Sequence, residues 1–221
     1  MLSHGFLKNR VDKKSIKSIH KKCNIFLEGK KKEENYFYLN DESIFDEIKN
    51  LEEFFLKDVK SLLNTKIPVL KAIELHIQKS KCRKIPPHQD NFYHCIDPDM
   101  GLKILLPLQE LNLENGGLIF LDCDINFSIQ SHKPSRVKNF SSEIEEQQLK
   151  KIKKSTTTYE YHIGDVSFHF LNSLHYSMGN KTNKDSIFLV FRYQNPNAKI
   201  NSAAQLRYNK CLEEHKRIIN K

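Results

Sequence analysis

Three residues, His88, Asp90 and His175, have the types and the spacing to bind a metal ion. Side chains at positions i and i+2 of a β-strand point to the same side, so His88 and Asp90 on one strand would face the same point. A second imidazole must then come from a distant strand. Two imidazoles and one carboxylate on one face are a typical ligand set for Fe(II), and they leave coordination positions free for other molecules.

The residues around these candidates form a series of motifs. Pro86-Pro87 precede His88, and the apolar run from Leu102 to Leu108 follows Asp90. The remaining motifs are Asn115-Gly116-Gly117 before Leu118-Ile119-Phe120-Leu121, Gly164-Asp165-Val166-Ser167-Phe168-His169, and His175-Tyr176-Ser177 with Asn180. This series, which spans about residues 70–195, resembles the phytanoyl-CoA dioxygenase family of Fe(II)/2-oxoglutarate oxygenases. The shared order of the motifs is far more specific than the His-x-Asp tripeptide.

The resemblance implies a fold, a set of cofactors and a reaction. The fold would be a double-stranded β-helix, and Fe(II) held by His88, Asp90 and His175 would work with 2-oxoglutarate and O2. The implied reaction hydroxylates an unactivated C–H bond and releases succinate and CO2. Asp90 leaves no ligand position for a halide, which favours a hydroxylase over a halogenase. His169 is the alternative to His175, but the family's ligand is the later His, so we expect His169 to pack.

The expected anchor for 2-oxoglutarate is missing. The family has an Arg eleven residues after the distal His, where this chain has Ser186. A buried dianion needs a cation, because an unpaired buried carboxylate is costly. Lys103 is the favoured candidate, since it is the only charge in its apolar run and since JmjC-type oxygenases use a Lys at comparable spacing. The other candidates for contact with 2-oxoglutarate are Arg192 and Lys184 as cations, and Ser186, Tyr93 and Ser177 as hydrogen-bonding partners.

Two further functions remain open beside the small-molecule hydroxylase, for which His94 is a candidate substrate contact. The first is a JmjC-like protein or peptide hydroxylase that uses Lys103 as its anchor. The second is a cupin-like metal-binding protein without redox chemistry, which the Ser186 departure would support. A nucleic-acid-binding module is disfavoured, because it leaves the three metal-ligand candidates unexplained.

Composition limits the class of protein. The chain has 221 residues, of which 38% are hydrophobic, so one domain with a substantial core is expected. No apolar stretch is long enough to span a membrane, and no apolar signal core follows Met1. Five scattered cysteines favour reduced thiols and a cytoplasmic location. The net charge of +9 permits an anionic substrate, although the excess of Lys over Arg also fits a coding bias.

The hydrophobic periodicity predicts an α+β fold with a mainly β core, a jelly roll braced by N-terminal helices. The predicted parts are a helical region over about 1–66, a jelly-roll core over about 67–195 and a C-terminal helix at about 203–221. Within the core, residues 124–156 are predicted to be either a lid over the site or a disordered surface loop. Helices are predicted at 12–28, 42–65 and 143–153, the last with a capping box from Ser142 to Glu145. Strands are predicted at 69–77, 102–108, 117–122, 157–163, 165–171 and 186–194.

Overall fold

The computed structural model describes residues 1–30, 36–98, 100–152 and 154–220 and shows a mainly β fold. The helices are α1 (Lys13–Glu28), α2 (Phe45–Lys49), η1 (a 3-10 helix, Asn50–Phe54), α3 (Leu56–Leu62), α4 (Asn91–His94), α5 (Glu146–Lys151) and α6 (Ser202–Ile219). The strands are β1 (His4–Leu7), β2 (Tyr36–Tyr38), β3 (Val69–Gln78), β4 (Ile85–Gln89), β5 (Ile96–Asp97), β6 (Gly101–Pro107), β7 (Leu118–Leu121), β8 (His132–Pro134), β9 (Ser142–Ile144), β10 (Thr156–Thr158), β11 (Val166–Phe170), β12 (Leu174–Ser177), β13 (Ser186–Gln194) and β14 (Lys199–Ile200).

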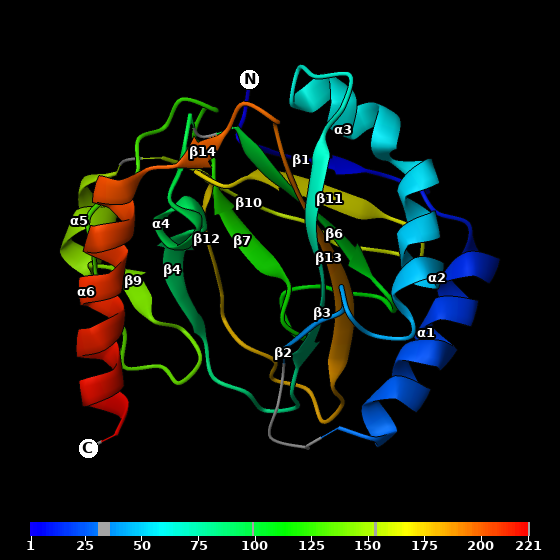
Figure 1. The fold of residues 1–221 in the computed structure, drawn as a ribbon. Helices are drawn as coiled ribbons and strands as arrows, with labels where there is room; N and C mark the ends of the chain where they lie inside the picture. The colour runs from blue at the N-terminus through cyan, green and yellow to red at the C-terminus, as the bar shows by residue number, and fades with distance from the viewer. Residues whose placement is uncertain (31–35, 99, 153, 221) are drawn as a thin grey trace.

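Two antiparallel sheets form the jelly roll that the sequence predicts (Figure 1). The larger has six strands in the order β1-β11-β6-β13-β3-β2, and the smaller has four in the order β10-β7-β12-β4. Leu105 and Val190 of the larger sheet pack in one cluster with Leu118 and Phe120 of the smaller. The two sheets therefore face each other, and the side chains between them line the interior of the barrel.

The N-terminal helices cover the outer face of the six-stranded sheet (Figure 1). Ile16 of α1 and Val59 of α3 belong to the same buried cluster as Leu75 of β3 and Leu189 of β13. Alternate residues of a strand face opposite sides, so this packing directs Glu74 and Val190 into the barrel. Asp12 caps α1 by accepting hydrogen bonds from the backbone N–H groups of residues 14 and 15.

Local structure departs from the predicted elements in several places. The helix predicted over 42–65 is divided, because the backbone at Phe55 leaves the helical region and its ring packs on Phe191, 4.9 Å away between ring centroids. The strand predicted at 157–163 is short, since β10 ends at Thr158 and Tyr161 beyond it forms only an isolated bridge with Leu111. The strands β1 and β2 lie in the region predicted to be helical and extend the larger sheet at its two edges.

The segment at 124–156, predicted as a possible lid, is folded within its described residues. It contains the hairpin β8–β9 and the helix α5. Ser142 pairs with Pro134 in that hairpin, so the predicted capping box is wrong, and Glu145 is the residue that precedes α5. The helix α6 packs against the hairpin, with His215 Nδ1 donating to the Ser135 carbonyl oxygen at 2.7 Å. Lys221, the last residue of the predicted C-terminal helix, lies outside the described residues.

All five cysteines are free. Within the described ranges, no helix has the length and the apolar character needed to cross a membrane.

Candidate metal centre

His88, Asp90 and His175 converge on one point inside the barrel. Each offers one ligand atom, and these three atoms lie within 4.8 Å of one another. His88 on β4 and His175 on β12 are direct partners across the smaller sheet. The Nε2 atoms of His88 and His175 are each 3.9 Å from an Asp90 carboxylate oxygen. Asp90 itself lies one residue beyond the end of β4, where α4 begins, and not within the strand as the His-x-Asp spacing suggests.

Backbone carbonyl groups fix the orientation of both imidazoles. His88 Nδ1 donates to the Pro86 carbonyl oxygen at 2.8 Å, and His175 Nδ1 donates to the Ser173 carbonyl oxygen at 3.0 Å. A carbonyl oxygen can only accept, so the proton of each neutral ring lies on Nδ1. The lone pair of each Nε2 is therefore free to bind a metal, which is the arrangement common among metal-binding histidines.

The protonation states also suit metal binding. Burial, together with the neighbouring imidazole of His175, lowers the pKa of His88 to about 3. Burial lowers the pKa of His175 to about 4, against the opposing effect of Asp90. Burial alone would raise the pKa of Asp90, but Lys103 and His169 outweigh it and hold that pKa well below its usual range. At neutral pH the site thus presents two neutral imidazoles and one carboxylate, the forms that coordinate metals.

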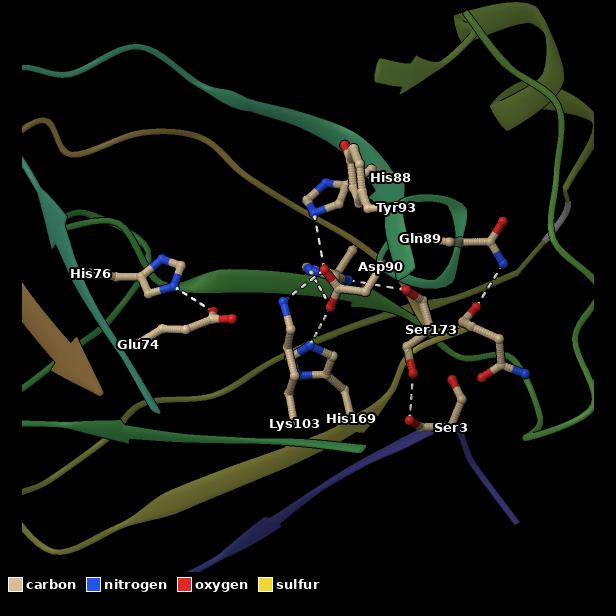
Figure 2. A network of polar contacts seen from close by, with 12 residues as sticks. Ser3, Glu74, His76, His88, Gln89, Asp90, Tyr93, Lys103, His169 and Ser173 are labelled. Atoms are coloured by element: carbon tan, nitrogen blue, oxygen red, sulfur yellow. Dashed lines mark hydrogen bonds and ion pairs between the residues drawn. The ribbon is translucent and has the colours of Figure 1, made fainter. Parts of the chain in front are cut away.

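Two further side chains hold the Asp90 carboxylate. Lys103 Nζ donates to Asp90 Oδ1 at 2.8 Å, and His169 Nε2 lies 3.1 Å from Asp90 Oδ2. Figure 2 shows Lys103 and His169 both directed at Asp90. His169 therefore does more than pack: it orients the carboxylate from outside the three-residue group, while its Nδ1 has no partner among the described residues.

Gln89, the middle residue of the His-Gln-Asp motif, forms hydrogen bonds between the site and neighbouring loops. Its side-chain amide donates to the carbonyl oxygens of Asn172, at 2.6 Å, and Ser128, at 3.1 Å. Its Oε1 accepts from the Gln130 backbone N–H at 2.7 Å. Because Gln89 points away from His88 and is fully buried, these bonds restrain the backbone on which both flanking ligands sit.

A buried charge network adjoins the site. Glu74 Oε1 lies 3.7 Å from Arg192 Nε, and Glu74 Oε2 lies 3.1 Å from His76 Nε2. Burial alone would raise the pKa of Glu74, but Lys103, His76 and Arg192 together lower it to about 2. Burial would lower the pKa of Lys103, yet Asp90 and Glu74 raise it. Glu74 was not singled out by the sequence analysis, although a lone carboxylate in an apolar strand is the same signal that identified Lys103.

A cavity of about 1050 Å³ opens beside the three ligands. Lys103, Tyr93 and His94 line it, and Tyr93 also donates from its hydroxyl to the Ser142 carbonyl oxygen at 3.1 Å. The other candidates for contact with 2-oxoglutarate, namely Arg192, Ser177, Ser186 and Lys184, are not among the described residues that line it. Ser177 donates to the Gly116 carbonyl oxygen, and Ser186 is buried with no partner for its hydroxyl among the described residues.

The metal-free protein should lose stability as the pH falls below about 6.5. The unfolded chain protonates His88 and His175 near pH 6.5, whereas the folded chain resists protonation down to about pH 3 and pH 4. Stability is therefore present above pH 6.5 and is lost as the pH falls toward those lower values. We expect a loss of about 3 to 5 kcal/mol between pH 6.5 and 4.5 in urea denaturation with a chelator present. The double variant His88→Gln/His175→Gln should show a shallower slope; an equal slope would contradict this account.

The chain resembles known proteins in its three-dimensional structure but not in its sequence. No protein-family model matches the chain, and no curated protein matches its sequence. The epimerase SnoN, solved with Fe3+, alpha ketoglutarate and nogalamycin RO, is similar with a TM-score of 0.72 and 14% identity over 90% of this chain and 82% of that one. EctD from S. alaskensis, solved with 2-oxoglutarate and 5-hydroxyectoine, has a TM-score of 0.71 and 14% identity over 90% of this chain and 74% of that one.

The non-heme monooxygenase ThoJ covers nearly all of the chain. Its TM-score is 0.69, with 15% identity over 99% of this chain and 95% of that one. At this level of identity the likeness concerns the fold alone. The chain has the jelly-roll fold that these solved proteins share.

Proposed function

We propose that this protein is an Fe(II)- and 2-oxoglutarate-dependent oxygenase that hydroxylates an unactivated C–H bond of a small molecule. The observation that carries the proposal is the convergence of His88, Asp90 and His175 beside one cavity, with both Nε2 lone pairs free. Two imidazoles and one carboxylate with open positions are the ligand set of non-haem Fe(II) oxygenases. The relatives in fold that are solved with iron or 2-oxoglutarate support the same cofactors.

The residues present fit a divalent iron. Their donor atoms are nitrogen and oxygen, both imidazoles are buried in the neutral form, and both are oriented by backbone carbonyl groups. Lys103 and His169 hold Asp90, so that the carboxylate is positioned before the metal arrives. When bound, iron and 2-oxoglutarate supply the activation of O2 and the oxidising power for C–H cleavage, with succinate and CO2 as products.

The charges inside the barrel also fit a dianion such as 2-oxoglutarate. The two carboxylates, Asp90 and Glu74, are balanced by the two cations, Lys103 and Arg192. A divalent metal then adds two positive charges, which a dianionic co-substrate neutralises. Charges buried in a low-dielectric interior are stable only when they are paired, so this balance favours a dianion despite Ser186.

Lys103 is the cation that we assign to the far carboxylate of 2-oxoglutarate. It lines the cavity, whereas Arg192 lies against Glu74 and Ser186 carries no charge. Its ammonium now bonds to Asp90, 2.8 Å away. Metal coordination by Asp90 would weaken that bond, and the long lysine side chain can then turn toward the co-substrate. Tyr93, which also lines the cavity, can add a hydrogen bond.

A small-molecule substrate is favoured over a protein or peptide. Besides residues of the two sheets, the segment at 137–141 and Tyr208 of α6 line the cavity, so several elements shape it. A JmjC-like peptide hydroxylase would share Lys103 but would need an open groove for an extended chain. Asp90 occupies the ligand position that a halide would need, which favours hydroxylation over halogenation. The relatives in fold also include an epimerase and a carbocyclase.

Formation of succinate tests the proposal. Protein loaded with Fe(II) in air should convert 2-oxoglutarate to succinate slowly even without substrate, whereas protein loaded with Zn(II), which has no redox chemistry, should not. The variant Asp90→Ala, incubated with Fe(II), should likewise form no succinate. Metal binding with no binding or turnover of 2-oxoglutarate would contradict the proposal and favour the cupin-like protein without redox chemistry.

A further inference from the structure

The cavity beside the metal ligands has aromatic walls. One row of rings runs along the larger sheet: Tyr38 and Tyr36 are 4.9 Å apart, Tyr36 and His76 are 4.8 Å apart, and His76 stacks on Phe188 at 5.3 Å between ring centroids. All four line the cavity. Tyr36 and Tyr38 remain 36% and 55% exposed, so part of their ring surface is available to a ligand.

A second group of rings reaches the metal ligands themselves. The ring centroid of Tyr93 lies 5.6 Å from that of His88, and Phe140 lies 6.2 Å from it. Tyr208 of α6 continues the group, 5.7 Å from Tyr93. These rings come from α4, from the segment after β8 and from α6, so they belong to a different part of the fold from the first row. A flat molecule in contact with this second group would lie beside His88.

Three exposed cations lie where the same cavity meets solvent. Arg83 and Lys84, in the loop before β4, line the cavity together with Lys138, and all three are exposed. Among the described residues, none of the three takes part in an ion pair. The two carboxylates that line the cavity, Glu74 and Asp90, are already paired with cations. The charge that a substrate meets at the mouth is therefore positive.

We infer that the substrate is a small molecule with a flat, conjugated ring system and an acidic group, such as a carboxylate, sulfonate or phosphate. The rings offer stacking and edge contacts that favour aromatic ligands over aliphatic chains. The cations at the mouth attract the acidic group, and the cavity of about 1050 Å³ is large enough for such a molecule beside 2-oxoglutarate. This inference rests on the proposed function, because it treats the cavity as the substrate site of that reaction.

Calorimetric titration with three probes tests the inference. Naphthalene-2-sulfonate is flat and anionic, octanesulfonate is anionic without a ring, and naphthylmethanol is flat and neutral. Each is titrated into metal-free protein and into protein loaded with Zn(II) and 2-oxoglutarate, which cannot turn over. We expect the affinity for naphthalene-2-sulfonate to be at least about five times that for either of the other probes. Octanesulfonate binding as tightly as naphthalene-2-sulfonate would overturn the inference.

Paired variants locate the binding. Tyr36→Leu should weaken binding of naphthalene-2-sulfonate about fivefold, whereas Tyr36→Phe, which keeps the ring, should not. Lys84→Gln should weaken it about threefold, whereas Lys71→Gln, an exposed lysine that does not line the cavity, should not. Unchanged affinity in both Tyr36→Leu and Lys84→Gln would refute the assigned cavity. Binding to metal-free protein is independent of iron chemistry, so this inference and the proposed function can fail separately.

Discussion

Replacing His175 with Ala should lower the affinity for Fe(II) at least about a hundredfold and abolish succinate formation. Loss of a residue that only orients a metal ligand typically costs 10- to 100-fold in affinity, so loss of a ligand itself should cost no less. The two remaining ligands, His88 and Asp90, cannot close three positions around the metal. Anaerobic calorimetry with Fe(II), or metal analysis after dialysis, measures the effect.

His169 provides the matched control for this prediction. It is also a buried imidazole near Asp90, and its ring centroid lies only 4.7 Å from that of His175. His169→Asn should lose only about tenfold in Fe(II) affinity, because Asp90 is then less well oriented. If His169→Asn lost Fe(II) binding while His175→Ala kept it, the assignment of the distal ligand would be reversed.

Replacing Lys103 with Met should raise the concentration of 2-oxoglutarate needed for half-saturation about a hundredfold while Fe(II) binding persists. Truncating one partner of a buried ion pair typically costs about 2 to 5 kcal/mol, and about 3 kcal/mol corresponds to that factor. Lys103 is suited to this role because it is nearly buried, lines the cavity and has a raised pKa. Titration of the Fe(II) protein with 2-oxoglutarate under anaerobic conditions gives the measurement.

Two variants separate the anchor from the rest of the charge network. Lys103→Arg preserves the cation and should recover much of the lost 2-oxoglutarate affinity. Arg192→Met leaves Glu74 buried without its guanidinium partner, so it should lower the stability of the fold more than the affinity for 2-oxoglutarate. If Arg192→Met weakened 2-oxoglutarate binding more than Lys103→Met, Arg192 would be the anchor.

The sequence predicts much of the fold because alternation and motif order constrain it. The strands of the barrel that carry Lys103 and Arg192 lie where the apolar pattern places them, as β6 and β13. The ends of helices and strands are less predictable where contacts between residues far apart in the sequence determine them. Phe55 interrupts a helix to pack on Phe191. Strand β1 pairs with the distant β11, with His4 opposite His169, and no local sequence pattern indicates this pairing.

Within the site, the sequence predicts which residues are present but not which of them contact one another. The spacing of His88, Asp90 and His175 indicated a metal site, and the structure brings those three together. The bonds of Asp90 to Lys103 and His169 depend on strands that pair only in the folded chain, where Lys103 is the direct partner of His169. The role of Glu74 was missed because its cations come from two other strands.

The most direct test is an anaerobic titration of metal-stripped protein with Fe(II) and then with 2-oxoglutarate, followed by visible absorption. We predict that a charge-transfer band of the iron chelate appears only when both Fe(II) and 2-oxoglutarate are present, and that it is absent in His175→Ala. Fe(II) binding without such a band at any concentration of 2-oxoglutarate would contradict the account, because the metal site would then lack the co-substrate on which the proposed reaction depends.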